Sequence, residues 1–251
     1  MKNILAIDIG NTNITLGLFS GDRLVRKLKT PTGSRHLHGR CLRSIRALGG
    51  SGDNDAPHII ISSVVPLALS RLIMELNKTS KCAISVIGRD RKAPIRNLYK
   101  NISEVGQDRL VNAFAAKTLY GSPSVIIDFG TAITFDVISG KGEYLGGLIL
   151  PGIEMSLSSL HSKTALLPKV ELKPATSIIG RDTVNSIRGG ILFGIGAMCD
   201  GLCAKYKKIL GNKTIIIATG GNAGLIQRYT RSIRIVDEDL TLKGLKLLSN
   251  I

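Results

Sequence analysis

Short apolar runs separated by polar, glycine-rich turns fill the first half of the chain. Each run is bounded by turn-forming residues, a pattern typical of β-strands. Strands are expected at 4–7, 14–19, 24–28, 59–61 and 83–87. A basic helix is expected at 35–48, and a helix at 66–77 begins with Pro66, which suits a first turn. Residues at helical spacing predict a further helix directly after Gly106. Strands that alternate with helices in this way indicate an α/β fold.

The second half of the chain restarts this pattern. Strands are expected at 125–127, 133–138, 144–149, 214–218 and 233–236. Helices are expected at 152–161, 183–209, 221–229 and 239–249. The segment AIDIGNTNIT at 6–15 aligns with IIDFGTAIT at 126–134 once one residue is skipped in the second copy. We interpret this repeat as a duplication.

A duplication of this kind predicts two similar halves. We place the boundary near 118–123, where Gly121, Ser122 and Pro123 interrupt the pattern. The N-terminal half is then 1–120 and the C-terminal half is 121–251, each a mixed sheet flanked by helices. Clefts between such halves are common ligand sites, so we expect an interdomain cleft.

Composition narrows the classes of function. Apolar residues make up 43% of the 251 residues, which excludes intrinsic disorder. The 34 basic and 18 acidic residues give a net charge of +16. Such a charge is compatible with three kinds of partner: nucleic acid, an acidic membrane or an anionic small substrate. No run of five like charges occurs, and Phe and Tyr number five each with no Trp, which disfavours nucleic acid. We expect the basic segment 21–50 to form a solvated face.

Several familiar sites are missing from the sequence. The four cysteines form no C-x-x-C pair and have no partners at zinc spacing, so we expect buried free thiols. No P-loop and no G-x-G-x-x-G motif is present. The N-terminal apolar run is too short for a signal peptide, and no apolar run approaches the ~18 residues of a membrane span. We therefore expect a cytoplasmic protein without a membrane partner.

Aspartate-and-glycine turns carry the remaining chemistry. Asp8 ends a strand and precedes a turn, and Asp128 does the same in the second copy. Backbone N–H groups in such turns bind phosphate, because glycine allows close approach, while the aspartate can hold Mg²⁺ through water. A third strand opens onto Gly220 and Gly221, a turn that lets a flat ring lie against the backbone.

These three turns resemble the phosphate-1, phosphate-2 and adenosine motifs of the sugar kinase/Hsp70/actin superfamily. Three further segments make the resemblance narrower: GQDR at 106–109, GGLILPG at 146–152 and GRDT at 180–183. With them, the whole chain resembles a type III pantothenate kinase. One departure is Asp182, where Ser or Asn is expected before the threonine.

The resemblance implies a fold, a reaction and partners. The fold is a pair of RNase H-like, actin-like halves. The reaction is ATP-dependent phosphorylation of pantothenate to 4′-phosphopantothenate, the first step of coenzyme A biosynthesis. The family works as a homodimer, uses Mg²⁺ with ATP, and is activated by a monovalent cation, K⁺ or NH₄⁺.

The resemblance also implies roles for individual residues. Asp108 matches the catalytic base, and Arg109 would bind the pantothenate carboxylate, a planar pairing that suits guanidinium. Asp108 starts a helix, so we expect the helix dipole to favour its ionised form and make it a weak base. The implied substrate contacts are Tyr99, Gly106, Gln107, Asp108, Arg109 and Thr183. The implied ATP contacts are Asp8, Gly10, Asn11, Thr12, Asn13, Gly130, Thr131, Gly220 and Gly221. Asp128 matches the K⁺ ligand, and Asp8 would hold Mg²⁺ through water.

Two other functions stay open at this point. The net charge motivates a nucleic-acid-binding or regulatory protein on the same fold. A kinase of the same superfold with another small hydroxyl substrate is the third alternative, because a fold does not determine a substrate.

Overall fold

The computed structural model describes residues 3–33, 39 and 57–251. The basic helix expected at 35–48 falls, apart from Gly39, outside these residues, as does Cys41. The chain forms two compact units. Unit 1 comprises Met1–Ile95, Asn101–Ala115 and Leu240–Ile251, and unit 2 comprises Arg96–Lys100 and Ala116–Asp239.

This division differs in two places from a single boundary near residue 120. The chain leaves unit 1 within helix α3 (Gln107–Leu119), close to the expected boundary. The last helix, α7 (Leu240–Ser249), nevertheless belongs to unit 1, and Arg96–Lys100 belongs to unit 2. The reason for the first difference is packing, since Leu242, Leu245 and Leu248 of α7 are buried in the core of unit 1.

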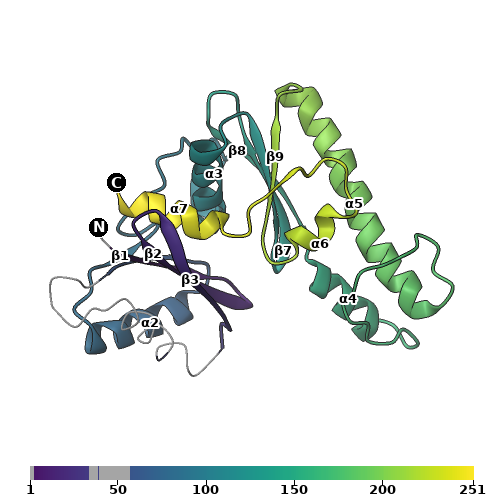
Figure 1. Cartoon of the computed structure of the whole chain (residues 1–251), viewed down its shortest axis with the longest axis horizontal. Coiled ribbons are helices and arrows are strands. Elements are labelled where there is room, and N and C mark those ends of the chain that lie inside the picture. The colour runs from purple at the N-terminus through teal and green to yellow at the C-terminus, as the bar shows by residue number, and fades with distance from the viewer. Residues whose placement is uncertain (1–2, 34–38, 40–56) are drawn as a thin grey trace. The chain divides into compact units, whose positions relative to one another are not determined.

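Unit 1 contains a five-stranded mixed sheet (Figure 1). Its strands, in the order β3-β2-β1-β4-β5, are β3 (Arg23–Pro31), β2 (Asn13–Ser20), β1 (Asn3–Ile9), β4 (His58–Ser63) and β5 (Ile84–Val86). Successive side chains of a strand point to opposite faces. Leu5 and Ile7 therefore share a core with α2 (Pro66–Thr79), while Ile4 and Ala6 share one with α7.

Unit 2 contains the second five-stranded sheet. Its strands, in the order β10-β9-β6-β7-β8, are β10 (Ile235–Val236), β9 (Ile215–Thr219), β6 (Ser124–Phe129), β7 (Ala132–Ile138) and β8 (Tyr144–Pro151). Helices α4 (Ile153–Ser162), α5 (Thr183–Leu210) and α6 (Ala223–Gln227) contribute to its core. In unit 1, a short 3₁₀ turn, η1 (Ile102–Glu104), precedes α3.

The registers of the two sheets confirm the duplication. Asp8 pairs with Thr15 on the antiparallel side and with Ser62 on the parallel side. Asp128 occupies the same position, paired with Thr134 and Thr219. The turn after β1 is one residue longer than the turn after β6, because Ile9 pairs with Ile14 whereas Phe129 pairs with Ile133. This difference is the residue skipped in the alignment.

Helix α5 is the longest element, with 28 residues. By length and composition alone it could cross a membrane, although it contains no long uninterrupted apolar run. The buried helices of soluble proteins satisfy the same criterion, and α5 places Leu192, Cys199 and Cys203 in the core of unit 2. The expectation of buried free thiols is therefore confirmed for these two cysteines, whereas Cys82 is free but only half-buried.

Candidate active site

The turn after β1 is held in shape by the end of the neighbouring hairpin. The Gly10 amide donates to the Asn13 carbonyl (3.0 Å), which closes the turn. The Thr32 hydroxyl donates to the Gly10 carbonyl (2.6 Å), and the Thr32 amide donates to the Thr12 carbonyl (3.0 Å). Asn11 and Thr12 are exposed at its tip, so the turn is braced on one side and open to a ligand on the other. The sequence assigned no role to Thr32, which follows β3 without a recognisable motif.

The turn after β6 is built in the same way. The Gly130 amide donates to the Ala132 carbonyl (3.1 Å), and Thr131 is exposed. Gly152, at the start of α4, lies so close that a Cβ atom there would overlap the Thr131 carbonyl. Gly152 therefore allows α4 to begin directly against the turn. The motif GGLILPG contained this signal, but its spacing alone did not reveal the contact.

The turn after β9 lies beside Asp128. Gly220 has a φ of +87°, a conformation that favours glycine. A Cβ atom at Gly220 would stand 2.5 Å from Asp128 Oδ1 and 2.8 Å from the Phe129 amide nitrogen. The structure thus brings the predicted phosphate-2 and adenosine turns together within unit 2, since β9 pairs with β6 up to Asp128.

The two aspartates suit hard cations. Carboxylate oxygens are ligands that Mg²⁺ prefers, and Mg²⁺ bound with a nucleotide needs only one or two of them. Within the described ranges no group of three or more His, Cys, Asp or Glu side chains could hold a metal ion. Gly130 and Gly220 both approach the Asp128 carboxylate closely, because Cβ atoms at these positions would stand 3.4 Å and 2.5 Å from its Oδ1 atom. These residues fit a cation that takes other ligands from water or phosphate.

The GQDR segment begins α3 in unit 1. The Asp108 Oδ1 atom accepts a hydrogen bond from the Arg109 amide (2.8 Å). A Cβ atom at Gly106 would stand 2.5 Å from this same Oδ1, so glycine is needed for the carboxylate to fold back over the backbone. Arg109 is buried, at 9% exposure. Gln107 packs against Gly88, where a Cβ atom would stand 2.8 Å from its Cδ.

The direction of the pKa shift of Asp108 differs from our expectation. Burial raises the pKa of the Asp108 carboxyl above its ordinary value, although the Arg109 amide and the Arg109 charge act in the opposite direction. We expected the start of a helix to favour the ionised form. That expectation was wrong, because loss of hydration outweighs the helix terminus at this position. A carboxylate with a raised pKa is a stronger base than an exposed aspartate.

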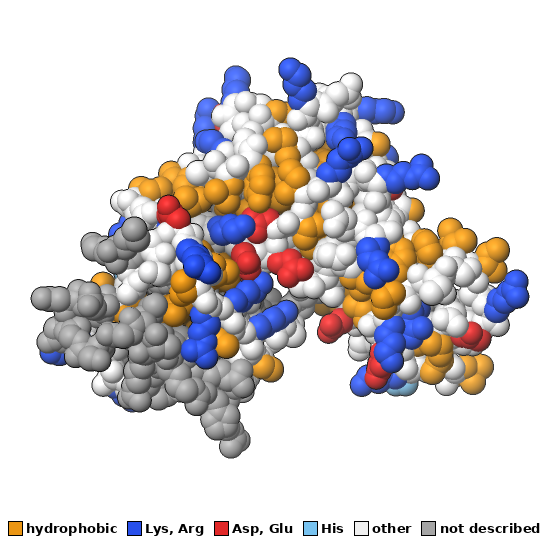
Figure 2. All heavy atoms as spheres, viewed as in Figure 1, with side chains coloured by type: hydrophobic (Ala, Val, Ile, Leu, Met, Phe, Trp, Pro, Cys, Tyr) orange, Lys and Arg blue, Asp and Glu red, His pale blue; other side chains and the backbone are white. Residues whose placement is uncertain are grey.

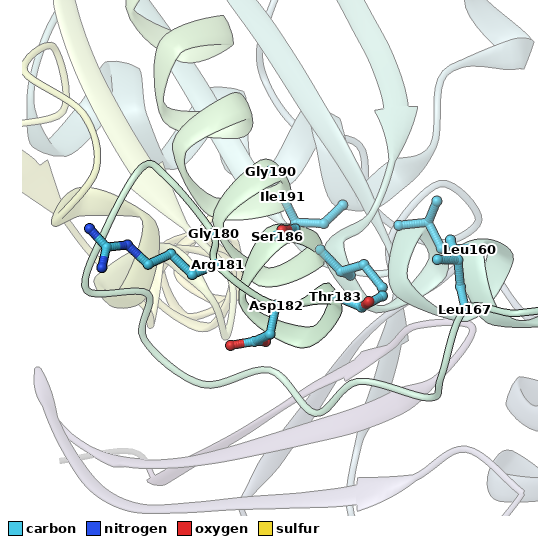
Figure 3. A pocket seen from close by; sticks show the side chains of 10 residues that line it. Leu160, Leu167, Gly180, Arg181, Asp182, Thr183, Ser186, Gly190 and Ile191 are labelled. Carbon is cyan, nitrogen blue, oxygen red and sulfur yellow. The ribbon is translucent and has the colours of Figure 1, made fainter.

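The remaining predicted substrate contacts lie in unit 2. Tyr99 belongs to the short segment Arg96–Lys100. Thr183 lines a pocket of about 630 Å³ with Leu160, Leu167 and Ile191. In Figure 3 the two leucines lie opposite Thr183, and the Arg181 side chain points away from them.

The unexpected Asp182 has a structural role. Its Oδ1 atom accepts a hydrogen bond from the Asn185 amide (2.8 Å), which makes it the N-cap of α5. This bond lowers the pKa of the Asp182 carboxyl. Asp is among the preferred residues at this position, so the departure from the family pattern leaves the helix start well capped.

Positive charge is spread over the described surface. The edge strand β3 exposes Arg23, Arg26, Lys27 and Lys29. Lys and Arg side chains occur on many parts of the face shown in Figure 2, with Asp and Glu side chains among them. The four basic side chains of β3, which lies in the segment 21–50, are therefore exposed, as expected.

Comparisons with known proteins cover nearly the whole chain. The family model described as type III pantothenate kinase matches residues 4–205. A type III pantothenate kinase from Syntrophus aciditrophicus is 38% identical over 248 residues, covering 98% of each chain. One from Anaeromyxobacter sp. (strain K) is 42% identical over the same length, again covering 98% of each chain.

Solved structures show the same fold at lower identity. A protein described as a Baf family transcriptional activator, from Campylobacter jejuni, gives a TM-score of 0.61 at 21% identity, covering 98% of this chain and 97% of that one. A polyphosphate/ATP-glucomannokinase from Arthrobacter sp. strain KM gives a TM-score of 0.52 at 14% identity, covering 98% of both chains. The architecture of duplicated sugar kinase and actin-like halves is thereby confirmed.

Proposed function

The chain belongs to the type III pantothenate kinase family, and on that premise we propose which of its residues carry out the reaction. The enzyme uses ATP to phosphorylate pantothenate, which leads to coenzyme A. The pantothenate hydroxyl oxygen forms a bond to the γ-phosphorus of ATP while the bond to the β–γ bridging oxygen breaks. ADP leaves, and the hydroxyl proton must be accepted by a base.

Asp108 is the proposed base and Arg109 the proposed ligand of the pantothenate carboxylate. The observation that carries this assignment is the pairing of a half-buried carboxyl, whose pKa is raised by loss of hydration, with a buried arginine at the next position. Because phosphoryl transfer has a loose transition state, the main work of Asp108 is to orient the hydroxyl and to accept its proton late. The other proposed pantothenate contacts are Gly106 and Gln107 in unit 1 and Tyr99 and Thr183 in unit 2.

The three glycine turns are the proposed ATP site. Gly10, Asn11, Thr12 and Asn13 would donate backbone and side-chain hydrogen bonds to phosphate oxygens, as would Gly130 and Thr131. Gly220 and Gly221 would lie against the adenosine. The hydrogen bonds from Thr32 to the first turn and the close packing of Gly152 against the second support this, since donors already held in place lose little entropy on binding.

Two cations complete the proposal. A kinase that uses ATP requires a divalent metal with its nucleotide, and Asp8 would hold Mg²⁺ through water. When bound, Mg²⁺ neutralises charge on the phosphates. We assign K⁺ or NH₄⁺ to the carboxylate of Asp128, which Gly130 and Gly220 approach closely without a side chain of their own, with backbone carbonyl groups as further ligands.

We further propose that the enzyme is a cytoplasmic homodimer. The outer face of α5 supports a helix contact, because Gly190, Gly194 and Gly201 are exposed and a Cβ atom at any of them would meet nothing within 4 Å. Replacing Gly194 with leucine should weaken the dimer in light scattering. A dimer that is unchanged by Gly194→Leu would remove α5 from the interface.

The first experiment is pantothenate-dependent release of ADP from Mg-ATP, with and without K⁺. Turnover should be stimulated by K⁺ and should fall by about 10²- to 10⁴-fold in Asp108→Asn. Glu104→Gln is the matched control, because it makes the same carboxyl-to-amide change at an exposed position four residues earlier. Full turnover in Asp108→Asn would reject Asp108 as the base.

Neither of the two alternative functions is supported by the comparisons. The family model and the curated relatives cover the chain with one activity, so another hydroxyl substrate has no support. The structure described as a transcriptional activator shares the fold at 21% identity, which carries no information on DNA binding.

A further inference from the structure

The ring of Tyr99 rests on Gly146 of strand β8. A Cβ atom at Gly146 would stand 3.0 Å from Tyr99 Cδ2 and 3.1 Å from Tyr99 Cε2. Both residues belong to unit 2. We propose that Gly146 is a positioning residue for pantothenate, acting through the ring of Tyr99. This inference rests on the proposed contact between Tyr99 and pantothenate.

The segment that carries Tyr99 is attached to the start of β8. The Leu98 amide donates to the Tyr144 carbonyl, and the Tyr144 amide donates to the Arg96 carbonyl, both at 2.9 Å. A salt bridge of 3.0 Å joins Arg96 Nη1 to Glu143 Oε1. Three interactions therefore hold the backbone beside β8, so a change in β8 is transmitted directly to the tyrosine.

An added Cβ atom at Gly146 would press on the ring. The Tyr99 amide donates to Asn97 Oδ1 (2.9 Å), which closes a local turn and holds the backbone that carries the ring. A new Cβ atom at 3.0 Å is closer than ordinary van der Waals contact, so the ring would have to shift by a few tenths of an ångström. Gly146 also has a φ of +105°, a backbone conformation that residues with a side chain rarely adopt.

Such a shift should affect one substrate selectively. Misplacement of a substrate-contacting group by a fraction of an ångström to one ångström can cost up to about 10²-fold. We expect the KM for pantothenate to rise by about tenfold, with the KM for ATP unchanged. Nothing in the proposed ATP site contacts Tyr99 among the described hydrogen bonds.

The test compares two variants with a control in the same hairpin. Gly146→Ala adds the Cβ atom. Gly146→Asn adds it too, and asparagine tolerates positive φ better than alanine does, which protects the fold. Gly142→Ala is the control, because Gly142 has a φ of +74° but a Cβ atom there meets only the flexible end of Lys117. Thermal melting curves show whether each variant is folded.

A double-mutant cycle with Tyr99→Ala decides whether Gly146 acts through the tyrosine. We expect Tyr99→Ala alone to raise the KM for pantothenate, and Gly146→Asn to add nothing in the Tyr99→Ala background. If Tyr99→Ala raises that KM and Gly146→Asn leaves it unchanged, the positioning role of Gly146 is overturned while the proposed site stands. Equal effects of Gly146→Asn with and without Tyr99 would also overturn it. If Tyr99→Ala leaves the KM unchanged, the proposed contact fails, and the inference fails with it.

Discussion

The hydroxyl of Tyr120 donates a 2.8 Å hydrogen bond to Oδ2 of Asp237. The two residues are far apart in the chain, Tyr120 directly after α3 and Asp237 directly after β10. Asp237 is buried at 6% exposure, and its other oxygen, Oδ1, accepts a hydrogen bond from the Asp239 amide (3.1 Å). The pair therefore joins the two ends of the segment Ala116–Asp239, which forms most of unit 2.

Removing the hydroxyl should destabilise the protein. We expect Tyr120→Phe to lower the free energy of unfolding by about 1 kcal/mol at pH 7, because the buried Asp237 loses a donor. Burial and Asp237 raise the pKa of Tyr120 to about 12. The stability that this proton provides is complete below the unfolded pKa of 10 and is lost as the pH rises toward 12. Urea denaturation of wild type and Tyr120→Phe should therefore converge at high pH, and curves that stay parallel would contradict the prediction.

Asp108→Asn should stabilise the fold while it removes activity. Burial raises the pKa of the Asp108 carboxyl, so the folded state holds the proton more tightly than the unfolded state. The free energy of unfolding therefore falls as the pH rises from the pKa of the unfolded state through that of the folded state. Ionisation of Asp108 thus destabilises the fold at pH 7. We expect a higher melting temperature for Asp108→Asn than for wild type at pH 7. An equal or lower melting temperature would contradict this prediction, because it would show that other interactions offset the lost hydration of the ionised carboxylate.

Gly220→Ala should impair both folding and nucleotide binding. The positive φ and the overlap with the backbone of Phe129 force the turn to move, at a cost of about 1–3 kcal/mol. Isothermal titration with Mg-ATP should show weaker binding. Gly140→Ala serves as the control, because a Cβ atom there meets nothing within 4 Å. Binding equal to that of the control would place adenosine elsewhere.

Asp200 anchors the loop after α6. Its Oδ1 atom accepts hydrogen bonds from the Thr230 hydroxyl (2.7 Å) and the Ser232 amide (2.8 Å). We expect Asp200→Ala to lower the free energy of unfolding by about 2 kcal/mol. Burial alone would raise the pKa of Asp200, but these hydrogen bonds lower it overall, so the stability they provide is lost as the pH falls below about 4. Chemical denaturation at pH 7 and at pH 3 should show a smaller difference from wild type at the lower pH.

Local patterns predicted most of the elements. The runs at 4–7 and 125–127 became the central strands β1 and β6, because β-branched residues buried on both faces have few other stable arrangements. Element ends were less predictable. The helix expected at 221–229 is only Ala223–Gln227, and the strand expected at 233–236 is only Ile235–Val236, since the hydrogen bonds to Asp200 organise the residues between them.

In the candidate site, too, some features follow from the local sequence and others only from the tertiary structure. The sequence by itself determined the duplication, the two aspartate turns and the GQDR segment, because each depends on residue types within a few positions of one another. Only the tertiary structure decided that Gly152 braces Thr131, that Gly220 lies against Asp128 and that Gly146 supports Tyr99. It also decided the direction in which the pKa of Asp108 shifts. Contacts between distant segments and the loss of hydration on burial depend on how the chain packs, and no local pattern of residues records them.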